Sequence, residues 1–144
     1  MRISDILDDK GRQVHTALPW ATIAQAAARL DDAGVGALLV CDADGRIRGM
    51  VSERDIVRGL TRHGRGLLDM QVQEIMTRNV TTCTPDDTVT EAMARMTRGR
   101  FRHLPVVDGG RLAGLVSIGD LVKHRVREME LETGVLRDTF IAHH

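Results

Sequence analysis

Aromatic residues are nearly absent from this chain. They make up 2% of its 144 residues, and the whole set is one Trp and two Phe, with no Tyr. Proteins that bind single-stranded nucleic acid stack bases on aromatic side chains, so this scarcity argues against that class. An excess of one charge is missing as well, because 20 Lys and Arg balance 20 Asp and Glu. No net field therefore recruits nucleic acid or an anionic membrane surface.

Long apolar runs and paired cysteines are also lacking. No stretch approaches the run of about 18 apolar residues that a membrane span requires, and the polar start MRISDILDDKGR does not resemble a signal peptide. Cys41 and Cys83 stand apart without a C-x-x-C motif, which favours reduced core residues. The histidines show no zinc-ligand spacing. We expect a cytoplasmic protein without a structural metal and without a membrane partner.

What is present is a tandem duplication. The stretch GMVSERDIV at Gly49–Val57 returns as GLVSIGDLV at Gly114–Val122. Earlier in each half, Pro19 corresponds to Pro85 at a similar distance from the repeated stretch. The halves differ by one residue at a turn, where ADGR in the first faces GGR in the second. A length change confined to a turn is typical of a duplicated unit, because loops tolerate insertions.

Each half carries the same pattern of predicted elements. An apolar opening leads to a short strand, a helix, two strands joined by a tight turn, and a second helix that starts after a Ser. Gly34 and Gly99 are predicted helix C-caps. The openings are Ile3–Leu7 and Val72–Met76; the strands are Gln13–Thr16, Ala37–Cys41, Ile47–Val51, Val80–Cys83, Leu104–Val107 and Leu112–Val116; the first helices are Ile23–Asp32 and Val89–Thr97. The sequence therefore predicts an α/β fold of two β-α-β-β-α units that pack together.

The predicted organisation has four parts. The first unit covers residues 1–62, a linker covers 63–71, the second unit covers 72–127, and the tail covers 128–144. The tail lies outside the repeat and carries apolar residues interrupted by Gly134. We expect it to be helical, and one role for it is to pack on a partner subunit.

Ser52-x-x-Asp55 and Ser117-x-x-Asp120 are the candidate functional motifs. One interpretation is structural: a Ser at the N-cap and an acidic residue three positions later form a capping box, worth about 1 kcal/mol. The other is a ligand site. Each motif follows a strand that begins with Gly, so a ligand can come close, and each helix N-terminus favours a phosphate. A carboxylate there can also accept the hydroxyls of a ribose.

These tandem motifs resemble a pair of CBS domains, the cystathionine β-synthase-type module. The stretches IMTRNVTTCTPDDTV and HLPVVDGGRLAGLVSIGDLV are especially similar to that family, and the resemblance covers about residues 1–127. It implies a pseudo-two-fold pair of units, the Bateman module, with two clefts that bind adenine nucleotides. AMP is the first expectation, and ADP, ATP or NAD(H) are alternatives. In the family the motif Asp holds the ribose hydroxyls, the Ser lies beside ribose or phosphate, and adenine enters between apolar strands.

Carried onto this chain, the resemblance assigns residues to two clefts. The first cleft comprises Met50, Val51, Ser52, Asp55, Asn79, Val80, Phe101, Arg102 and His103. The second comprises Gln13, Val14, Val35, Gly36, Ala37, Leu115, Val116, Ser117 and Asp120. The hypothesis for the phosphate is that its charge is met near Arg54, Arg102 and His103, which makes the cleft of Asp55 the better nucleotide site.

The sequence shows no catalytic constellation. The motif serines lack the G-x-S-x-G elbow, and no Ser-His or Cys-His pair falls in a known catalytic motif. We therefore expect a non-catalytic nucleotide sensor that forms a homodimer of paired units and signals to an unidentified downstream protein. The alternative is a structural dimerisation or docking module without a physiological nucleotide. A nucleotide hydrolase is a third interpretation, and it lacks a candidate general base or metal-binding carboxylate cluster.

Overall fold

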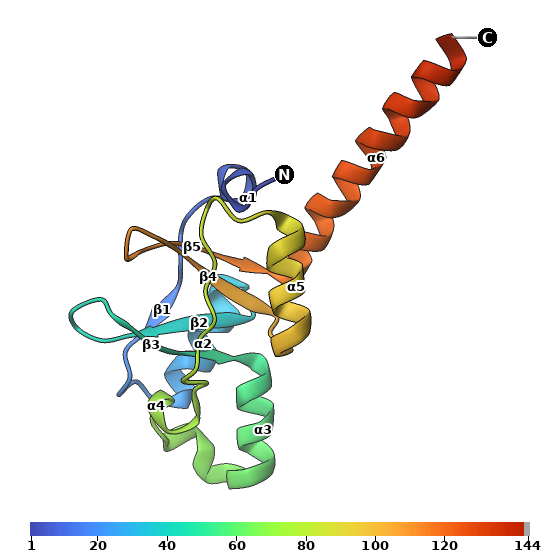
Figure 1. Cartoon of the computed structure of the whole chain (residues 1–144). Coiled ribbons are helices and arrows are strands. Elements are labelled where there is room, and N and C mark those ends of the chain that lie inside the picture. The colour runs from blue at the N-terminus through green and yellow to red at the C-terminus, as the bar shows by residue number, and fades with distance from the viewer. Residues whose placement is uncertain (143–144) are drawn as a thin grey trace. The chain divides into compact units, whose positions relative to one another are not determined.

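The computed structural model describes the backbone of residues 1–142 and the side chains of residues 1–134. The chain forms two compact units, each with its own sheet (Figure 1). The central unit is Gln13–Val80, and the terminal unit combines Met1–Arg12 with Thr81–His144. The α/β class built from a duplicated unit is thus confirmed.

The central unit contains a sheet of three strands in the order β1-β2-β3. Strand β1 (Thr16–Ala17) runs parallel to β2 (Ala37–Cys41), and β2 pairs antiparallel with β3 (Ile47–Ser52). The first four residues of β2 are all buried, as expected for an apolar central strand covered on both faces. Gly45, in the turn before β3, has a positive φ of 81° that a tight hairpin requires.

Four helical segments accompany this sheet: α2 (Ile23–Ala33), α3 (Glu53–His63), the 3-10 helix η1 (Gly64–Asp69) and α4 (Val72–Ile75). Helix α2 begins where Thr22 and Gln25 form a capping box, in which the Thr22 hydroxyl accepts from the Gln25 N–H at 3.1 Å and the Gln25 side chain accepts from the Thr22 N–H at 2.9 Å. The expected linker is therefore folded, since η1 occupies most of it and Leu67 is fully buried in the core of the central unit.

The terminal unit contains a two-stranded antiparallel sheet of β4 (His103–Asp108) and β5 (Arg111–Ser117). The expected first strand, Val80–Cys83, is reduced to a single parallel bridge between Cys83 and Val106. Proline explains the difference. In the central unit the Leu39 N–H donates to the carbonyl of His15 at 3.1 Å, whereas the corresponding position in the terminal unit is Pro105, which has no N–H to donate.

Three helices complete the terminal unit: α1 (Ile3–Lys10), α5 (Val89–Gly99) and α6 (Ile118–Ala142). Helix α6 has 25 residues, about twice the usual length of a helix in a globular protein. It begins at the end of β5 and continues well past α5 (Figure 1).

The two predicted C-caps have different outcomes. Gly34 ends α2 in the left-handed region with φ 65°, as predicted. The prediction for Gly99 is wrong, because Gly99 is the last helical residue and Arg100 takes the left-handed cap with φ 58°. Glycine is required at position 99 for another reason: a Cβ there would lie 2.1 Å from the Phe101 ring.

The apolar openings of the two halves have exchanged places. Ile3, Ile6 and Leu7 of α1 are buried in the core of the terminal unit, together with residues of α5, β4, β5 and α6. Conversely, Val72 and Met76 around α4 pack in the core of the central unit with Leu38, Val40 and Val51 among others. Each opening thus covers the sheet of the other half of the sequence.

Candidate functional site

Both Ser-x-x-Asp motifs lie at a corner where a strand ends and a helix begins. At the end of β3 the Asp55 carboxylate accepts from the Ser52 N–H at 2.9 Å, and the Ser52 hydroxyl accepts from the Asp55 N–H at 3.3 Å. At the end of β5 the corresponding distances for Ser117 and Asp120 are 2.8 and 3.1 Å. Each motif therefore forms a capping box, and each carboxylate is held at a helix N-terminus.

The corner of the central unit holds Asp55 in a buried position, where it is 9% exposed. Besides the Ser52 N–H, its carboxylate accepts from the Ser52 hydroxyl at 3.1 Å and from the Thr77 hydroxyl at 3.2 Å. Thr77 follows α4 and reaches this corner because its backbone pairs with Met50 in an antiparallel bridge. A buried carboxylate needs such donors, since desolvation otherwise disfavours it.

The corner of the terminal unit has a cation in place of the threonine. The Lys10 ammonium, at the end of α1, donates to the Asp120 carboxylate at 2.7 Å and to the Leu115 carbonyl at 2.9 Å. Partial burial acts to raise the pKa of Asp120, but the hydrogen bonds from Lys10 and from the Ser117 N–H outweigh it, so the pKa lies below its ordinary value. Asp120 is thus ionised and paired with a positive charge.

Lys10 and Thr77 satisfy corresponding groups in the two units. In the central unit, the Thr77 N–H donates to the Met50 carbonyl at 2.8 Å while its hydroxyl donates to the motif Asp. In the terminal unit, one ammonium makes both contacts, to Leu115 and to the motif Asp. The two corners therefore share a backbone geometry but differ by one positive charge.

Sequence analysis did not select these two residues. Lys10 lies far from Asp120 in the sequence, and Thr77 lies 22 positions from its partner Asp55. The available signal was that each residue follows an apolar opening, Lys10 after Ile3–Leu7 and Thr77 after Val72–Met76. It could have been used only if the exchange of the openings between the units had been known.

Glycine allows close approach at both corners. A Cβ at Gly49 would lie 2.6 Å from the Thr77 carbonyl oxygen, and a Cβ at Gly114 would lie 2.6 Å from Cδ2 of Leu7. Real Cβ atoms do not approach other atoms so closely. At Gly49 the obstructing atom is a backbone oxygen, so glycine is needed there, whereas at Gly114 it is the end of a leucine side chain, which can move.

The predicted site residues divide between the two units. The central unit holds Gln13, Val14, Val35, Gly36, Ala37, Met50, Val51, Ser52, Arg54, Asp55, Asn79 and Val80; the terminal unit holds Phe101, Arg102, His103, Leu115, Val116, Ser117 and Asp120. Val51 and Val116 are fully buried in the cores of their own units, so only their backbone is available to a ligand.

Sheet register places further predicted residues beside the motif of their own unit. Ala37 pairs with Ser52, and the preceding Gly36 accepts a hydrogen bond from the Glu53 N–H at 3.0 Å. In the terminal unit, His103 pairs with Ser117, and the Arg102 carbonyl accepts from the Ile118 N–H at 2.8 Å. Within the terminal unit, therefore, Arg102 and His103 neighbour the motif of Asp120.

The part of the chain that the structure describes was compared with the requirements of a metal site and of a membrane span. No group of three or more His, Cys, Asp or Glu there is arranged to hold a metal ion. No described helix combines the length and the apolar character needed to cross a bilayer.

Comparison with known proteins identifies the class. The family model of the CBS domain matches residues 4–62 and 72–127. Since these matches cover most of the chain, the protein belongs to the CBS-domain family and contains two such domains.

Solved structures with the same fold include a CBS-domain-containing protein from Agrobacterium tumefaciens, with 45% identity and a TM-score of 0.84 over 86% of this chain and 92% of that one. A CBS-domain protein from Pyrobaculum aerophilum, complexed with AMP, has 32% identity and a TM-score of 0.79 over 92% and 99%. A third, a CBS domain pair in complex with 5′-methylthioadenosine and S-adenosyl-L-methionine, has 27% identity and a TM-score of 0.79 over 89% and 98%.

Proposed function

We propose that this CBS pair is a non-catalytic regulatory module that senses an adenine nucleotide. AMP is the first candidate, and ADP, ATP and NAD(H) are the alternatives. The observation that carries the proposal is the pair of fixed carboxylates, Asp55 and Asp120, at the N-termini of α3 and α6. Relatives that hold AMP, or the adenosine compounds 5′-methylthioadenosine and S-adenosyl-L-methionine, support the choice of ligand class.

The chemistry of each carboxylate suits a ribose. A carboxylate offers about four acceptor positions. The hydrogen bonds described above use two of them on Asp120 and three on Asp55, so each can accept at least one ribose hydroxyl. The backbone N–H groups of the helix N-terminus favour a nearby phosphate.

The proposed binding residues are the two sets named from the sequence, with the apolar strand residues around adenine. Arg54, Arg102 and His103 are the proposed phosphate-binding groups. A variant pair tests this role. Arg102→Ala should weaken AMP binding and leave adenosine binding unchanged, whereas Arg98→Ala should alter neither. Equal loss of AMP and adenosine binding would contradict a phosphate contact.

Signalling follows from a shift in population. A ligand that prefers one arrangement of the module, or of a homodimer of such modules, raises the share of that arrangement. A downstream protein, still to be identified, reads the change. The cytoplasm remains the proposed compartment, on the ground of the free cysteines Cys41 and Cys83.

Thermal unfolding with AMP, ADP, ATP, NAD and guanosine nucleotides tests the proposal. Ligand at about 100 times its Kd adds roughly 2.7 kcal/mol of stability. For a protein of this size that corresponds to a Tm increase of several degrees, at about 2–4 °C per kcal/mol. An increase with adenine nucleotides, lost in Asp55→Asn or Asp120→Asn but kept in Asp8→Asn, would establish the sensor. The last variant is an exposed control.

The alternative is a structural module for dimerisation or docking, and one observation favours it. Both motif carboxylates already complete a capping box, so neither requires a ligand to explain its presence. No change in Tm with any nucleotide, together with a loss of about 1 kcal/mol in Ser52→Ala, would support this alternative.

A further inference from the structure

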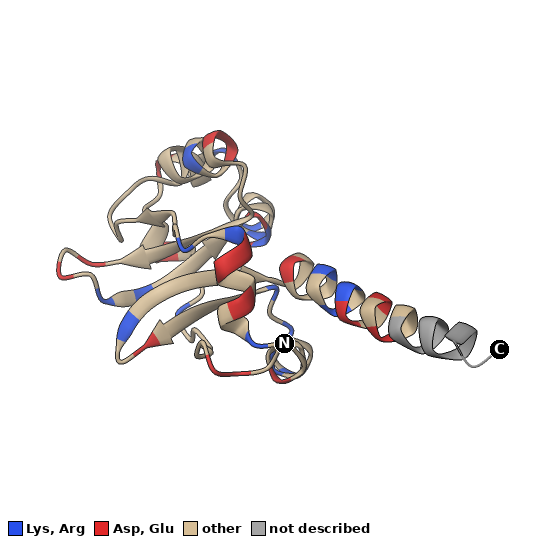
Figure 2. Ribbon diagram, turned by 90° about the horizontal axis from the view of Figure 1, so that it is seen from above, with Lys and Arg blue, Asp and Glu red and all other residues tan. Residues whose placement is uncertain are grey.

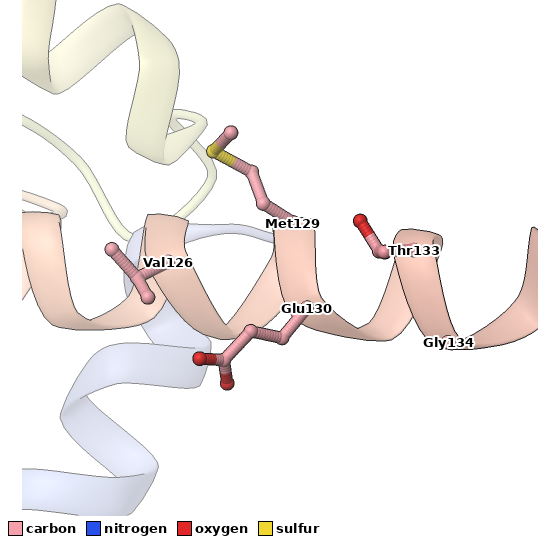
Figure 3. A pocket seen from close by; sticks show the side chains of 5 residues that line it. All are labelled: Val126, Met129, Glu130, Thr133 and Gly134. Atoms are coloured by element: carbon pink, nitrogen blue, oxygen red, sulfur yellow. The ribbon is translucent and has the colours of Figure 1, made fainter. Parts of the chain in front are cut away.

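Helix α6 carries an exposed apolar seam that does not face its own unit. The seam consists of Val122, Val126, Met129 and Thr133, all exposed, with the first three at 44%, 46% and 52%. A shallow hollow runs along it, lined by Val126, Met129, Glu130, Thr133 and Gly134. Figure 3 shows Met129 and Thr133 pointing to the same side of the helix.

The contacts of α6 with its own unit lie on a different face. Leu121 is fully buried and His124 is 5% exposed. The Glu128 carboxylate pairs with the amino terminus of Met1 at 2.7 Å. At 3.6 residues per turn, the seam lies roughly 130° around the helix from this face. The terminal unit therefore leaves the seam uncovered.

The spacing of the seam is that of a coiled coil. Successive positions are separated by four, three and four residues, which corresponds to alternating d and a positions of a heptad. Val126 and Thr133 occupy a, and Val122 and Met129 occupy d. The sequence continues the spacing with Leu136 at d and Phe140 at a, so that the pattern extends over about three heptads. Helices owe most of their stability in water to a packed apolar face, so a seam of this length requires a partner.

Charges beside the seam indicate which partner fits. In a parallel pair of helices, a g position of one faces the next e position of the other. Here Arg125 at g would face Glu130 of a second copy, a combination of opposite signs. Along the described part of α6 three basic residues precede three acidic ones, and Figure 2 shows charges of both signs on this helix: Lys123, Arg125 and Arg127, then Glu128, Glu130 and Glu132.

An antiparallel arrangement is complementary as well. With Val122 of one copy opposite Thr133 of the other, Lys123 would face Glu130 and Arg125 would face Glu132. Opposite charges in such positions favour association, so two seams fit each other in either direction. Arg125 also donates to Glu128 of its own helix at 3.1 Å, but a guanidinium has five N–H donors and can serve both carboxylates.

We propose that the seam of α6 binds the same seam of a second copy of this chain, forming a two-stranded coiled coil. This goes beyond nucleotide sensing, because it assigns the dimer contact to the helix that extends past the repeat.

Sedimentation of the full chain tests the proposal. Wild type should be a dimer, and Met129→Glu should dissociate it at least a hundredfold more readily. Leu131→Glu is the matched control, because Leu131 is even more exposed, at 67%, but lies outside the seam. It should leave the dimer intact. Circular dichroism of each variant separates loss of assembly from loss of fold. A monomeric wild type, or equal effects of both variants, would overturn the proposal.

Cross-linking and charge test the seam itself. In a Cys41→Ser background, the double variant Val126→Cys, Met129→Cys should form an intermolecular disulfide rapidly, because these positions meet in either direction, and Leu131→Cys should not. Glu130→Arg should weaken the dimer about tenfold, since symmetric exposed ion pairs with the second copy change sign in either direction. A dimer that forms no disulfide through the seam, or that Glu130→Arg leaves unchanged, would refute the proposal.

Discussion

The ammonium of Lys10 offers a direct test of the geometry at the second motif. Lys10→Met removes the charge and keeps most of the aliphatic stem, so the lost interactions are those with Asp120 and the Leu115 carbonyl, at 2.7 and 2.9 Å. The side chains of Lys10 and Asp120 are 35% and 25% exposed. Fully exposed ion pairs contribute about 0.2–1 kcal/mol, and hydrogen bonds to charged groups about 1.5–3 kcal/mol. Partial exposure places this pair at about 1 kcal/mol.

A double-mutant cycle isolates that value. Urea unfolding of wild type, Lys10→Met, Asp120→Asn and the double variant should give a coupling energy of about 1 kcal/mol, equivalent to about 2–4 °C in Tm. Lys123→Met, which changes an exposed lysine of α6, is the control and should have little effect. A coupling energy below about 0.3 kcal/mol, the usual error of additivity, would refute the assigned contact.

The same cycle has a defined pH dependence. The pKa of Asp120 is lowered from its ordinary value of 3.8, so the ionised carboxylate stabilises the folded state. This contribution is fully present above the ordinary pKa and is lost as the pH falls through the lower folded value. The coupling energy should therefore be constant from pH 7 to pH 5 and decline only in strong acid. A decline already near neutrality would indicate that another group titrates.

Two further predictions concern close packing and thiol reactivity. Gly49→Ala should lower the free energy of unfolding by about 1–3 kcal/mol, because the new Cβ meets the rigid Thr77 carbonyl. Gly114→Ala should lower it by less, because the new Cβ meets only the end of a flexible leucine side chain. The urea midpoints of both variants measure these losses, and the reverse order would contradict the reasoning. Cys83 is 1% exposed, and burial raises its pKa to about 11. A thiol reagent should therefore modify the half-buried Cys41 of the native protein first. Equal rates of modification of the two cysteines would show that the terminal unit opens readily.

Local patterns predicted most of the secondary structure. The apolar residues of α2 and α5 recur at helical spacing, and Thr22 and Thr88 begin these helices through capping boxes with Gln25 and Glu91. Such signals act between residues that are close in the sequence, so they survive without tertiary information. The strand that was lost, at Val80–Cys83, shows the limit. Its pairing depends on Pro105, which lies on another strand.

The capping boxes at the two corners of the candidate site were predicted, and its ligand-binding residues remain a proposal. The carboxylates at positions 55 and 120 and their serines follow from the repeat, and the capping boxes follow from their spacing. The assignment of Arg102 and His103 to the cleft of Asp55 remains a proposal. Their pairing beside Ser117 was not predicted, because antiparallel register becomes known only when both strands and their turn are placed.

By itself, the sequence determined the duplication and the two Ser-x-x-Asp corners, since each of these is a relation between residue types at short or repeated intervals. Only the tertiary structure decided that α1 covers the sheet of the second half, and hence that Lys10 reaches Asp120 while Thr77 reaches Asp55. Both openings are apolar and either could cover either sheet. The path of the chain and the fit of Leu7 over Gly114 and of Met76 over Gly49 made the choice, and these contacts join residues that are distant in the sequence.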